Sequence, residues 1–284
     1  MQGPVVVGVD DSDTSLRAVE WAAEEARRRG LRLSMVMAFP APSPDSAFIW
    51  RQEEIDRNPR AALDRPAERA TSLAPGLDVD RTVVTKSAPL ALLQHAEKAA
   101  MLVVGLRGRG GFPGLRVGSV AYRVAARSPV PVVVVGPEPV TGDRDEIVVG
   151  EDGSSPAERA VAEAFAAAAV GPGAVRVVRA WSPPVFPVST RGFSSAERAA
   201  IGAGEERSLE QRLAPWRDRY PSVEVRTEVV ESRPVAALVR AARGARLVVV
   251  GASGRHALSP LTLGSTAHAM LHRSPCPVMV VHAP

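Results

Sequence analysis

Three glycines and a serine recur at one spacing in two places along the chain. The two sets are Gly105, Gly108, Gly118 and Ser119, then Gly251, Gly254, Gly264 and Ser265. Glycine lets backbone N–H groups approach phosphate oxygens closely, and the free N–H groups at a helix start favour an anion. A valine-rich run precedes each set and a predicted helix begins within it, which is the order that phosphate binding needs. The spacing therefore predicts two phosphate-binding loops, with ordinary strand-to-helix loops as the alternative interpretation.

The two loops belong to a duplicated segment. The sequence VVVGVDDSDTS (5–15) near the start matches IVVGEDGSSPA (147–157) in the second half. A repeat of about 140 residues is too long for a solenoid and indicates two copies of one domain. The Gly- and Pro-containing stretch GPEPVTGDRD (136–145) is typical of a linker. We therefore expect one domain over 1–140 and a second over 141–284.

Each copy alternates apolar strands with helices. Apolar runs without alternation are typical of strands covered on both faces, and helices between them imply parallel crossovers. Charged helical stretches are expected at about 51–72 and 195–219, and Ser155 is expected to cap the helix that follows it. The fold class predicted is α/β, with two tandem doubly wound five-stranded parallel-sheet domains. Such sheets bind ligands beyond the carboxyl ends of strands, where strand order reverses.

Composition excludes several classes of protein. The chain is 45% hydrophobic but only 4% aromatic, which indicates a packed Ala/Val core. The net charge is +4 and no basic run exceeds residues 27–29, so nucleic-acid binding is not expected. A single cysteine, Cys276, permits no internal disulfide, and charged residues interrupt every long apolar run. With no signal-peptide pattern at the N-terminus, we expect a cytoplasmic protein without a membrane segment.

Side chains for catalysis or metal binding are not identifiable. The only lysines, Lys86 and Lys98, lie outside both glycine segments, so a P-loop ATPase or kinase is unsupported. His268 and His272 are four residues apart on a predicted helix, but no further ligand stands at a spacing suited to zinc. We expect both histidines to be ordinary helix-face residues and Cys276 to be a small apolar filler. No catalytic residue and no metal site is predicted.

The spacing G-x2-G-x9-G-[ST], the opening VGVDDS (7–12) and the closing P-V-x-V-V resemble the universal stress protein family. The resemblance covers nearly the whole chain, as a tandem of two copies. It implies a fold similar to that of nucleotide α-hydrolases, a homodimer and, for the subset with this glycine spacing, binding of ATP with or without Mg²⁺. Asp11 departs from the family pattern, which has glycine after the acid, and Leu106 and Ala252 stand where serine is common.

Carried over position by position, the resemblance implies one adenine-nucleotide site in each copy. Asp10 and Asp152 would face the nucleoside, although ordinary turn aspartates remain an alternative. The backbones of Ala38 and Ala180 would read adenine. The triphosphate and ribose would be held by Gly105, Gly108, Gly118, Ser119 and Val120, and in the second copy by Gly251, Gly254, Gly264, Ser265 and Thr266. Arginines that could reach phosphates are Arg107, Arg109 and Arg116 in the first copy, against Arg255 and His256 in the second, so tighter binding is expected in the first.

We therefore expect an ATP-binding regulator of the stress response or of dormancy, with little or no hydrolysis. Two alternatives stay open. One is a slow ATP hydrolase or transferase, which would need a group that positions water or an acceptor. The other is a scaffold with vestigial nucleotide sites that binds an unidentified protein partner. Nucleotide retained by the purified protein would separate the regulator from the scaffold, and turnover with magnesium would favour the enzyme.

Overall fold

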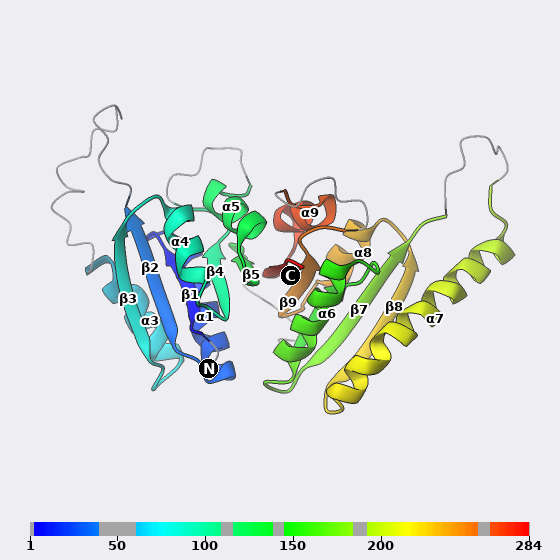
Figure 1. The fold of residues 1–284 in the computed structure, drawn as a ribbon, viewed down its shortest axis with the longest axis horizontal. Helices are drawn as coiled ribbons and strands as arrows, with labels where there is room; N and C mark the ends of the chain where they lie inside the picture. The colour runs from blue at the N-terminus through cyan, green and yellow to red at the C-terminus, as the bar shows by residue number, and fades with distance from the viewer. Residues whose placement is uncertain are drawn as a thin grey trace. The chain divides into compact units, whose positions relative to one another are not determined.

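The computed structural model describes residues 3–39, 61–108, 116–138, 145–183, 192–254 and 262–283. The chain divides into two compact units, Met1–Pro139 (unit 1) and Val140–Pro284 (unit 2). Each unit contains a sheet of five parallel strands with helices on both faces (Figure 1). The predicted fold class, two tandem doubly wound α/β domains, is confirmed.

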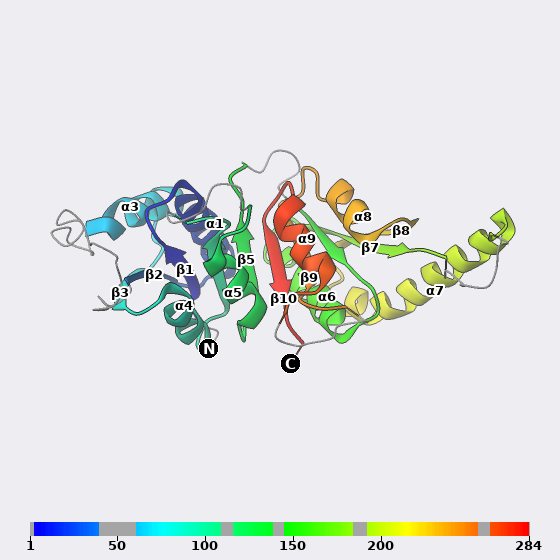
Figure 2. The ribbon, with the colours of Figure 1, turned by 90° about the horizontal axis from the view of Figure 1, so that it is seen from above.

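Unit 1 places its sheet between two pairs of helices. Its elements are β1 (Val5–Val9), α1 (Asp13–Arg29), β2 (Leu33–Phe39), η1 (Ala61–Leu63), α3 (Asp64–Leu73), β3 (Val79–Thr85), α4 (Ala88–Ala96), β4 (Met101–Gly105), α5 (Ser119–Arg127) and β5 (Val132–Val135). The strand order is β3-β2-β1-β4-β5, with Val5 of β1 opposite Leu33 of β2 and Met101 of β4. Figure 2 shows α1 and α3 on one face of this sheet and α4 and α5 on the other. Strand order therefore reverses between β1 and β4, where doubly wound sheets form a ligand crevice.

Unit 2 repeats this topology. Its elements are β6 (Glu146–Gly150), α6 (Ser155–Ala168), β7 (Ala174–Trp181), α7 (Ser195–Arg219), β8 (Glu224–Glu231), α8 (Pro234–Ala241), β9 (Leu247–Gly251), α9 (Ser265–Arg273) and β10 (Val278–Val281). The strand order is β8-β7-β6-β9-β10. Helices α6 and α7 pack on one face of the sheet, and α8 and α9 pack on the other. Strand order reverses between β6 and β9, as it does between β1 and β4.

Small side chains form the core. Val5 and Val7 of β1 are 0% exposed, as are Ala18 and Ala22 on the face of α1 that packs against the strands. Valine suits strands that are buried on both faces, and alanine lets a helix lie close to them. The largest fully buried side chain is Phe165 of α6, in unit 2. This packing explains how a chain with so few aromatic residues forms two compact units.

Side-chain caps set the starts of the helices that follow the first strand of each unit. Ser12 caps α1, which ends at Gly30 in the left-handed conformation with a φ of 63°. Helix α6 is capped by Ser154, whose side chain accepts a hydrogen bond from the backbone N–H of Ala157. The expectation that Ser155 is the cap was therefore wrong by one residue, since Ser155 is already helical.

The charged stretches expected to be helical have different outcomes in the two units. In unit 2 the stretch forms α7, Ser195–Arg219, as predicted. In unit 1, η1 and α3 cover the later part of the expected range 51–72, and residues 51–60 lie outside the described residues. Figure 1 shows α7 lying along β8.

The described residues contain neither a membrane-spanning helix nor a cluster of metal-binding side chains. No helix among them is long and apolar enough to cross a bilayer. Within the same ranges, no group of three or more His, Cys, Asp or Glu side chains is placed to hold a metal ion.

Candidate functional site

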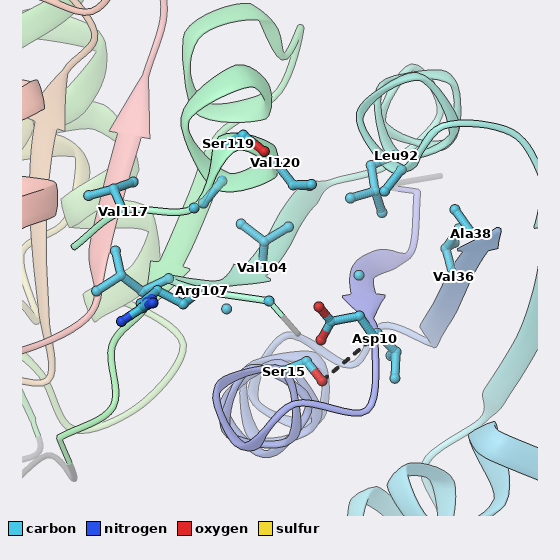
Figure 3. A pocket seen from close by; sticks show the side chains of 18 residues that line it. Asp10, Ser15, Val36, Ala38, Leu92, Val104, Arg107, Val117, Ser119 and Val120 are labelled. Atoms are coloured by element: carbon cyan, nitrogen blue, oxygen red, sulfur yellow. Dashed lines mark hydrogen bonds between the residues drawn. The ribbon is translucent and has the colours of Figure 1, made fainter. Parts of the chain in front are cut away.

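A cavity of about 390 Å³ opens at the carboxyl ends of β1 and β4 in unit 1. Its lining comes from β1, β2, β4, the loop after β4, and the helices α1, α4 and α5 (Figure 3). The cavity lies where strand order reverses, and its volume falls within the range typical of small-molecule sites. Of the predicted site residues of this copy, Asp10, Ala38, Gly105, Arg107, Gly108, Gly118, Ser119 and Val120 all line it. The structure therefore brings that set together around one space.

Asp10 is held in one orientation by the turn that follows β1. Its Oδ1 accepts hydrogen bonds from the Ser12 hydroxyl at 2.6 Å and from the Ser12 backbone N–H at 3.2 Å. The backbone N–H of Asp10 donates to the Ser15 hydroxyl at 3.4 Å, and Figure 3 shows the carboxylate directed into the cavity. Unit 2 repeats the turn, because Asp152 Oδ1 accepts from the Ser154 hydroxyl at 2.6 Å and from its N–H at 3.0 Å. Both aspartates therefore form ordinary turns, and in unit 1 the Asp10 side chain also lines the cavity.

The glycine loop lies directly against this carboxylate. A Cβ atom added to Gly108 would stand 2.2 Å from Asp10 Oδ2, and one added to Gly254 would stand 2.8 Å from Asp152 Oδ2. Both distances are shorter than real Cβ contacts allow, so a side chain at either position would displace the loop or the acid. The second glycine of the motif is therefore needed for the close approach of two segments that are distant in the sequence.

The outer glycines of the motif join the loop to its strand and to its helix. A Cβ on Gly105 would stand 2.7 Å from the Thr14 carbonyl carbon, so this glycine lets β4 pack closely on the start of α1. Gly118 donates its N–H to the Leu106 carbonyl at 2.8 Å, and Gly264 donates to the Ala252 carbonyl at 2.7 Å. These two glycines are the N-cap residues of α5 and α9.

The start of each motif helix is suited to an anion. The N-cap residues of α5 and α9 are glycines, which make no side-chain cap hydrogen bond, whereas serine hydroxyls cap α1 and α6. Backbone N–H groups without a side-chain cap, together with the helix dipole, favour negative charge. In unit 1 this helix start lines the cavity through Ser119, Val120 and Ala121. The first turn of α5 can therefore face a phosphate.

A hydroxyl contact that sequence reasoning missed holds the loop in unit 1. The Arg107 carbonyl accepts a hydrogen bond from the Thr14 hydroxyl, and the Ser12 hydroxyl, which donates to Asp10, lies 3.3 Å from the same carbonyl. In unit 2 the residue aligned with Thr14 is Pro156, which carries no hydroxyl. A Ser-x-Thr pattern after the acid is a sequence signal for this role, but the same pattern also indicates a helix cap.

The remaining predicted residues lie in different settings. The Arg107 side chain extends away from Asp10 in Figure 3. Ala180 lies on β7 one residue before its end, as Ala38 does on β2, and Thr266 lies in the first turn of α9. Arg109, Arg255 and His256 lie outside the described residues.

The position after the acid adopts a left-handed backbone in both units. Gly153 has a φ of 82°, and Asp11 at the aligned position has a φ of 65°. Among the described residues, Asp11 is the one non-glycine residue with a positive φ. The departure of Asp11 from the family's glycine therefore leaves the turn geometry unchanged, at the cost of backbone strain.

Cys276 has the character of a packing residue. It is buried, and burial raises the pKa of its thiol to about 11. A thiol that stays protonated at neutral pH is a poor nucleophile.

Comparison with known proteins extends over both units. The profile of the universal stress protein family matches residues 1–136 and 144–282. A universal stress protein of Mycobacterium tuberculosis is 34% identical over 98% of this chain and 97% of its own length. A second one from the same organism is 31% identical over 97% of this chain and 95% of its own.

The fold also matches a solved structure over its whole length. The crystal structure of a universal stress protein from Archaeoglobus fulgidus aligns with a TM-score of 0.72 at 19% identity, covering 99% of this chain and 98% of that one. The profile match to both halves and the full-length identity to known members together show that this chain belongs to the universal stress protein family, with two copies of the family's domain.

Proposed function

We propose that each unit binds one adenine nucleotide, ATP in the first instance, and that binding serves regulation rather than turnover. The observation that carries this proposal is the cavity of unit 1, where an oriented carboxylate, a glycine loop and an uncapped helix start meet at the reversal of strand order. A carboxylate can accept hydrogen bonds from ribose hydroxyls, and a helix start can bind phosphate oxygens. The two groups therefore suit opposite ends of one nucleotide.

Each part of the site has an assigned role. The Asp10 carboxylate faces the nucleoside, and the backbone of Ala38 at the end of β2 reads the adenine edge. The loop from Gly105 to Gly108 and the first turn of α5 from Ser119 hold the phosphates. Asp10 is the only carboxylate among the described residues that line the cavity, so an accompanying Mg²⁺ would be held mainly by phosphate oxygens and water.

A regulatory role is favoured over catalysis by the ionisable groups of the cavity. Among the described lining residues these are Asp10 and Arg107. Asp10 already accepts two hydrogen bonds from Ser12, and the Arg107 side chain extends away from it. Phosphoryl transfer needs groups that orient a water or an acceptor in line with the γ-phosphate. We therefore expect hydrolysis to be slow or absent.

The two sites are proposed to differ in affinity. In unit 1, the Thr14 hydroxyl holds the carbonyl of Arg107, whereas Pro156 stands at the aligned position in unit 2. A loop already held in its bound geometry loses less conformational entropy when ligand binds. We therefore expect unit 1 to bind ATP more tightly than unit 2.

The experiment for the proposed function is nucleotide analysis of the purified chain. The protein is denatured, and released nucleotide is identified by chromatography and absorbance, with calorimetric titration of nucleotide-free protein by ATP alongside. Adenine nucleotide in the supernatant and saturable ATP binding are expected. Phosphate release at ordinary enzymatic rates would instead support a hydrolase, and an absence of binding would support a scaffold with vestigial sites.

The cellular setting and assembly are proposed on the family resemblance. We expect the protein to act in the cytoplasm as a homodimer and to pass its nucleotide state to a protein partner. Light scattering tests the assembly, since the dimer would have twice the chain mass of 30.0 kDa. A mass of one chain at micromolar concentration would contradict the dimer.

A further inference from the structure

Unit 2 buries a pair of opposite charges directly beside its candidate nucleotide loop. Arg179 on β7 contacts Glu151, the residue before Asp152, with a guanidinium nitrogen 2.5 Å from Oε2. The two side chains are 3% and 1% exposed. At the aligned positions of unit 1, Val9 and Met37 are register partners on adjacent strands and are equally buried. The same place in the fold is thus filled by apolar side chains in one copy and by an ion pair in the other.

The ion pair connects the Asp152 loop to helix α7. One carboxylate oxygen, Glu151 Oε1, accepts from the backbone N–H of Gly153 at 2.8 Å and from Arg212 Nε at 2.9 Å. Gly153 immediately follows Asp152, and Arg212 lies on α7. A single oxygen therefore bonds both to the loop that presents the acid and to a helix 61 residues away in the chain.

A second contact ties α7 to the same network. Arg179 contacts the Glu205 carboxylate at 3.3 Å and donates to the Glu205 carbonyl at 3.3 Å. The residues of α7 buried in the described structure are Leu209 and Leu213, which lie between and next to these two ionic contacts. The charged network and the apolar attachment of α7 thus occupy one stretch, 205–213.

Stability is a weak reason for placing an ion pair here. Desolvation of buried charges offsets most of their attraction, and well-packed apolar residues often serve as well. The Val9 and Met37 pair shows that the fold accepts apolar residues at these positions. What Glu151 adds is two hydrogen bonds, from Gly153 and from Arg212, that join the loop to the helix. Its contact with Arg179 is ionic only, since Glu151 Oε2 and Arg179 Nε have no hydrogen-bond partner among the described residues.

We propose that Glu151 is a positioning residue that couples the Asp152 loop to α7. Nucleotide bound in unit 2 then stabilises the packing of α7, and a partner that holds α7 in place raises nucleotide affinity by the same factor, as linkage requires. This inference rests on the proposed function of unit 2. It assigns α7 as the element of that unit which responds to nucleotide.

The test compares the native chain with the double variant Glu151→Val, Arg179→Met, which installs the residue pair of unit 1. Amide hydrogen exchange of residues 205–213 is followed with and without saturating ATP, and calorimetry on the same samples reports binding. In the native chain, ATP should slow this exchange at least about fivefold, the lower end of typical coupling. In the double variant ATP should still bind, but the slowing should fall below about twofold. Equal slowing in both proteins, or no slowing in a native chain that binds ATP in unit 2, would overturn the proposal.

A third variant and a measurement without nucleotide distinguish loss of coupling from loss of folding or of ATP binding. Arg212→Met removes the bond from α7 to Glu151, together with a 3.8 Å contact to the exposed Glu158, and leaves the buried pair intact. Arg212 is 36% exposed, so this variant should fold and should also lose the slowing. Without nucleotide, the Gly153 amide should exchange about fivefold faster in the double variant, because its acceptor is gone. An unchanged Gly153 amide would refute the coupling even if ATP binds to neither protein, whereas failure of the native chain to bind ATP refutes the proposed function by itself.

Discussion

Substitution of Gly108 by alanine should disable the site of unit 1 selectively. The new Cβ atom would stand 2.2 Å from Asp10 Oδ2, and real Cβ contacts stay beyond about 3.0 Å, so the loop and the carboxylate must separate by about 0.8 Å. Asp10 cannot swing away freely because Ser12 holds its other oxygen at 2.6 Å. The same change at Gly254 starts from 2.8 Å and requires a shift of only about 0.2 Å from Asp152.

The loss of affinity is estimated from the hydrogen bond between the Asp10 carboxylate and the nucleotide, which the displaced carboxylate could no longer make. A hydrogen bond to a charged group contributes about 1.5–3 kcal/mol, and each 1.4 kcal/mol changes affinity about tenfold. Gly108→Ala should therefore weaken ATP binding in unit 1 by about 10- to 150-fold. Gly254→Ala should weaken binding in unit 2 by less than about tenfold, because a shift of that size can be absorbed locally.

Calorimetric titration with ATP resolves the two sites by their affinities. Gly136→Ala is the matched control, because a Cβ there meets no atom within 4 Å and its φ is not positive. Thermal unfolding of all variants should remain cooperative. The reasoning is refuted if Gly108→Ala binds ATP as the native chain does, or if Gly254→Ala loses more affinity than Gly108→Ala.

Three further predictions concern stability and reactivity. Asp11→Gly should raise the free energy of unfolding by about 0.5–1 kcal/mol in urea denaturation, since relief of left-handed strain exceeds the entropy cost of glycine. A free energy of unfolding below that of the native chain would contradict this. Cys276, with a pKa of about 11, should be ionised in only about one molecule in a thousand at pH 8. A disulfide reagent should therefore label it slowly until denaturant is added. Rapid labelling of the folded protein would show that the thiol is accessible and ionised. Glu151→Val should cost about 3 kcal/mol, the lower end for a broken buried pair, because the buried Arg179 keeps only its contact with the Glu205 carboxylate. Adding Arg179→Met should restore most of that loss, and equal stability of the single and double variants would be inconsistent with a buried pair.

The fold was predictable because it depends on local patterns. Valine runs buried on both faces mark the strands, and duplication of the pattern gives each unit the same topology. The helix at about 195–219 was predicted as a charged helical stretch, and in the structure a capping box formed by Ser194 and Glu197 marks its start. The cap of α6 was placed one residue late because Ser154 and Ser155 are adjacent serines, and the hydrogen bond that the Ser154 hydroxyl accepts from the Ala157 N–H is a detail that identifies the cap only in the structure.

The glycine motif of the candidate site was predictable from the sequence, but the tertiary contacts that hold its loops in place were not. The Thr14 hydroxyl reaches the Arg107 carbonyl across 93 residues, and the Glu151 and Arg179 pair depends on the exact register of β6 and β7. Such contacts carry no local periodicity, so spacing within the chain does not reveal them. The two units also differ at these contacts, since Thr14 aligns with Pro156, and Glu151 and Arg179 align with Val9 and Met37.

The stoichiometry of ATP binding to the nucleotide-free chain, with phosphate release followed in the same samples, tests whether both units bind nucleotide without turnover. We predict two ATP molecules per chain, the tighter one in unit 1, and phosphate release far slower than ordinary enzymatic turnover. Absence of saturable adenine-nucleotide binding up to about 1 mM, a free energy near −4 kcal/mol, would contradict the central claim.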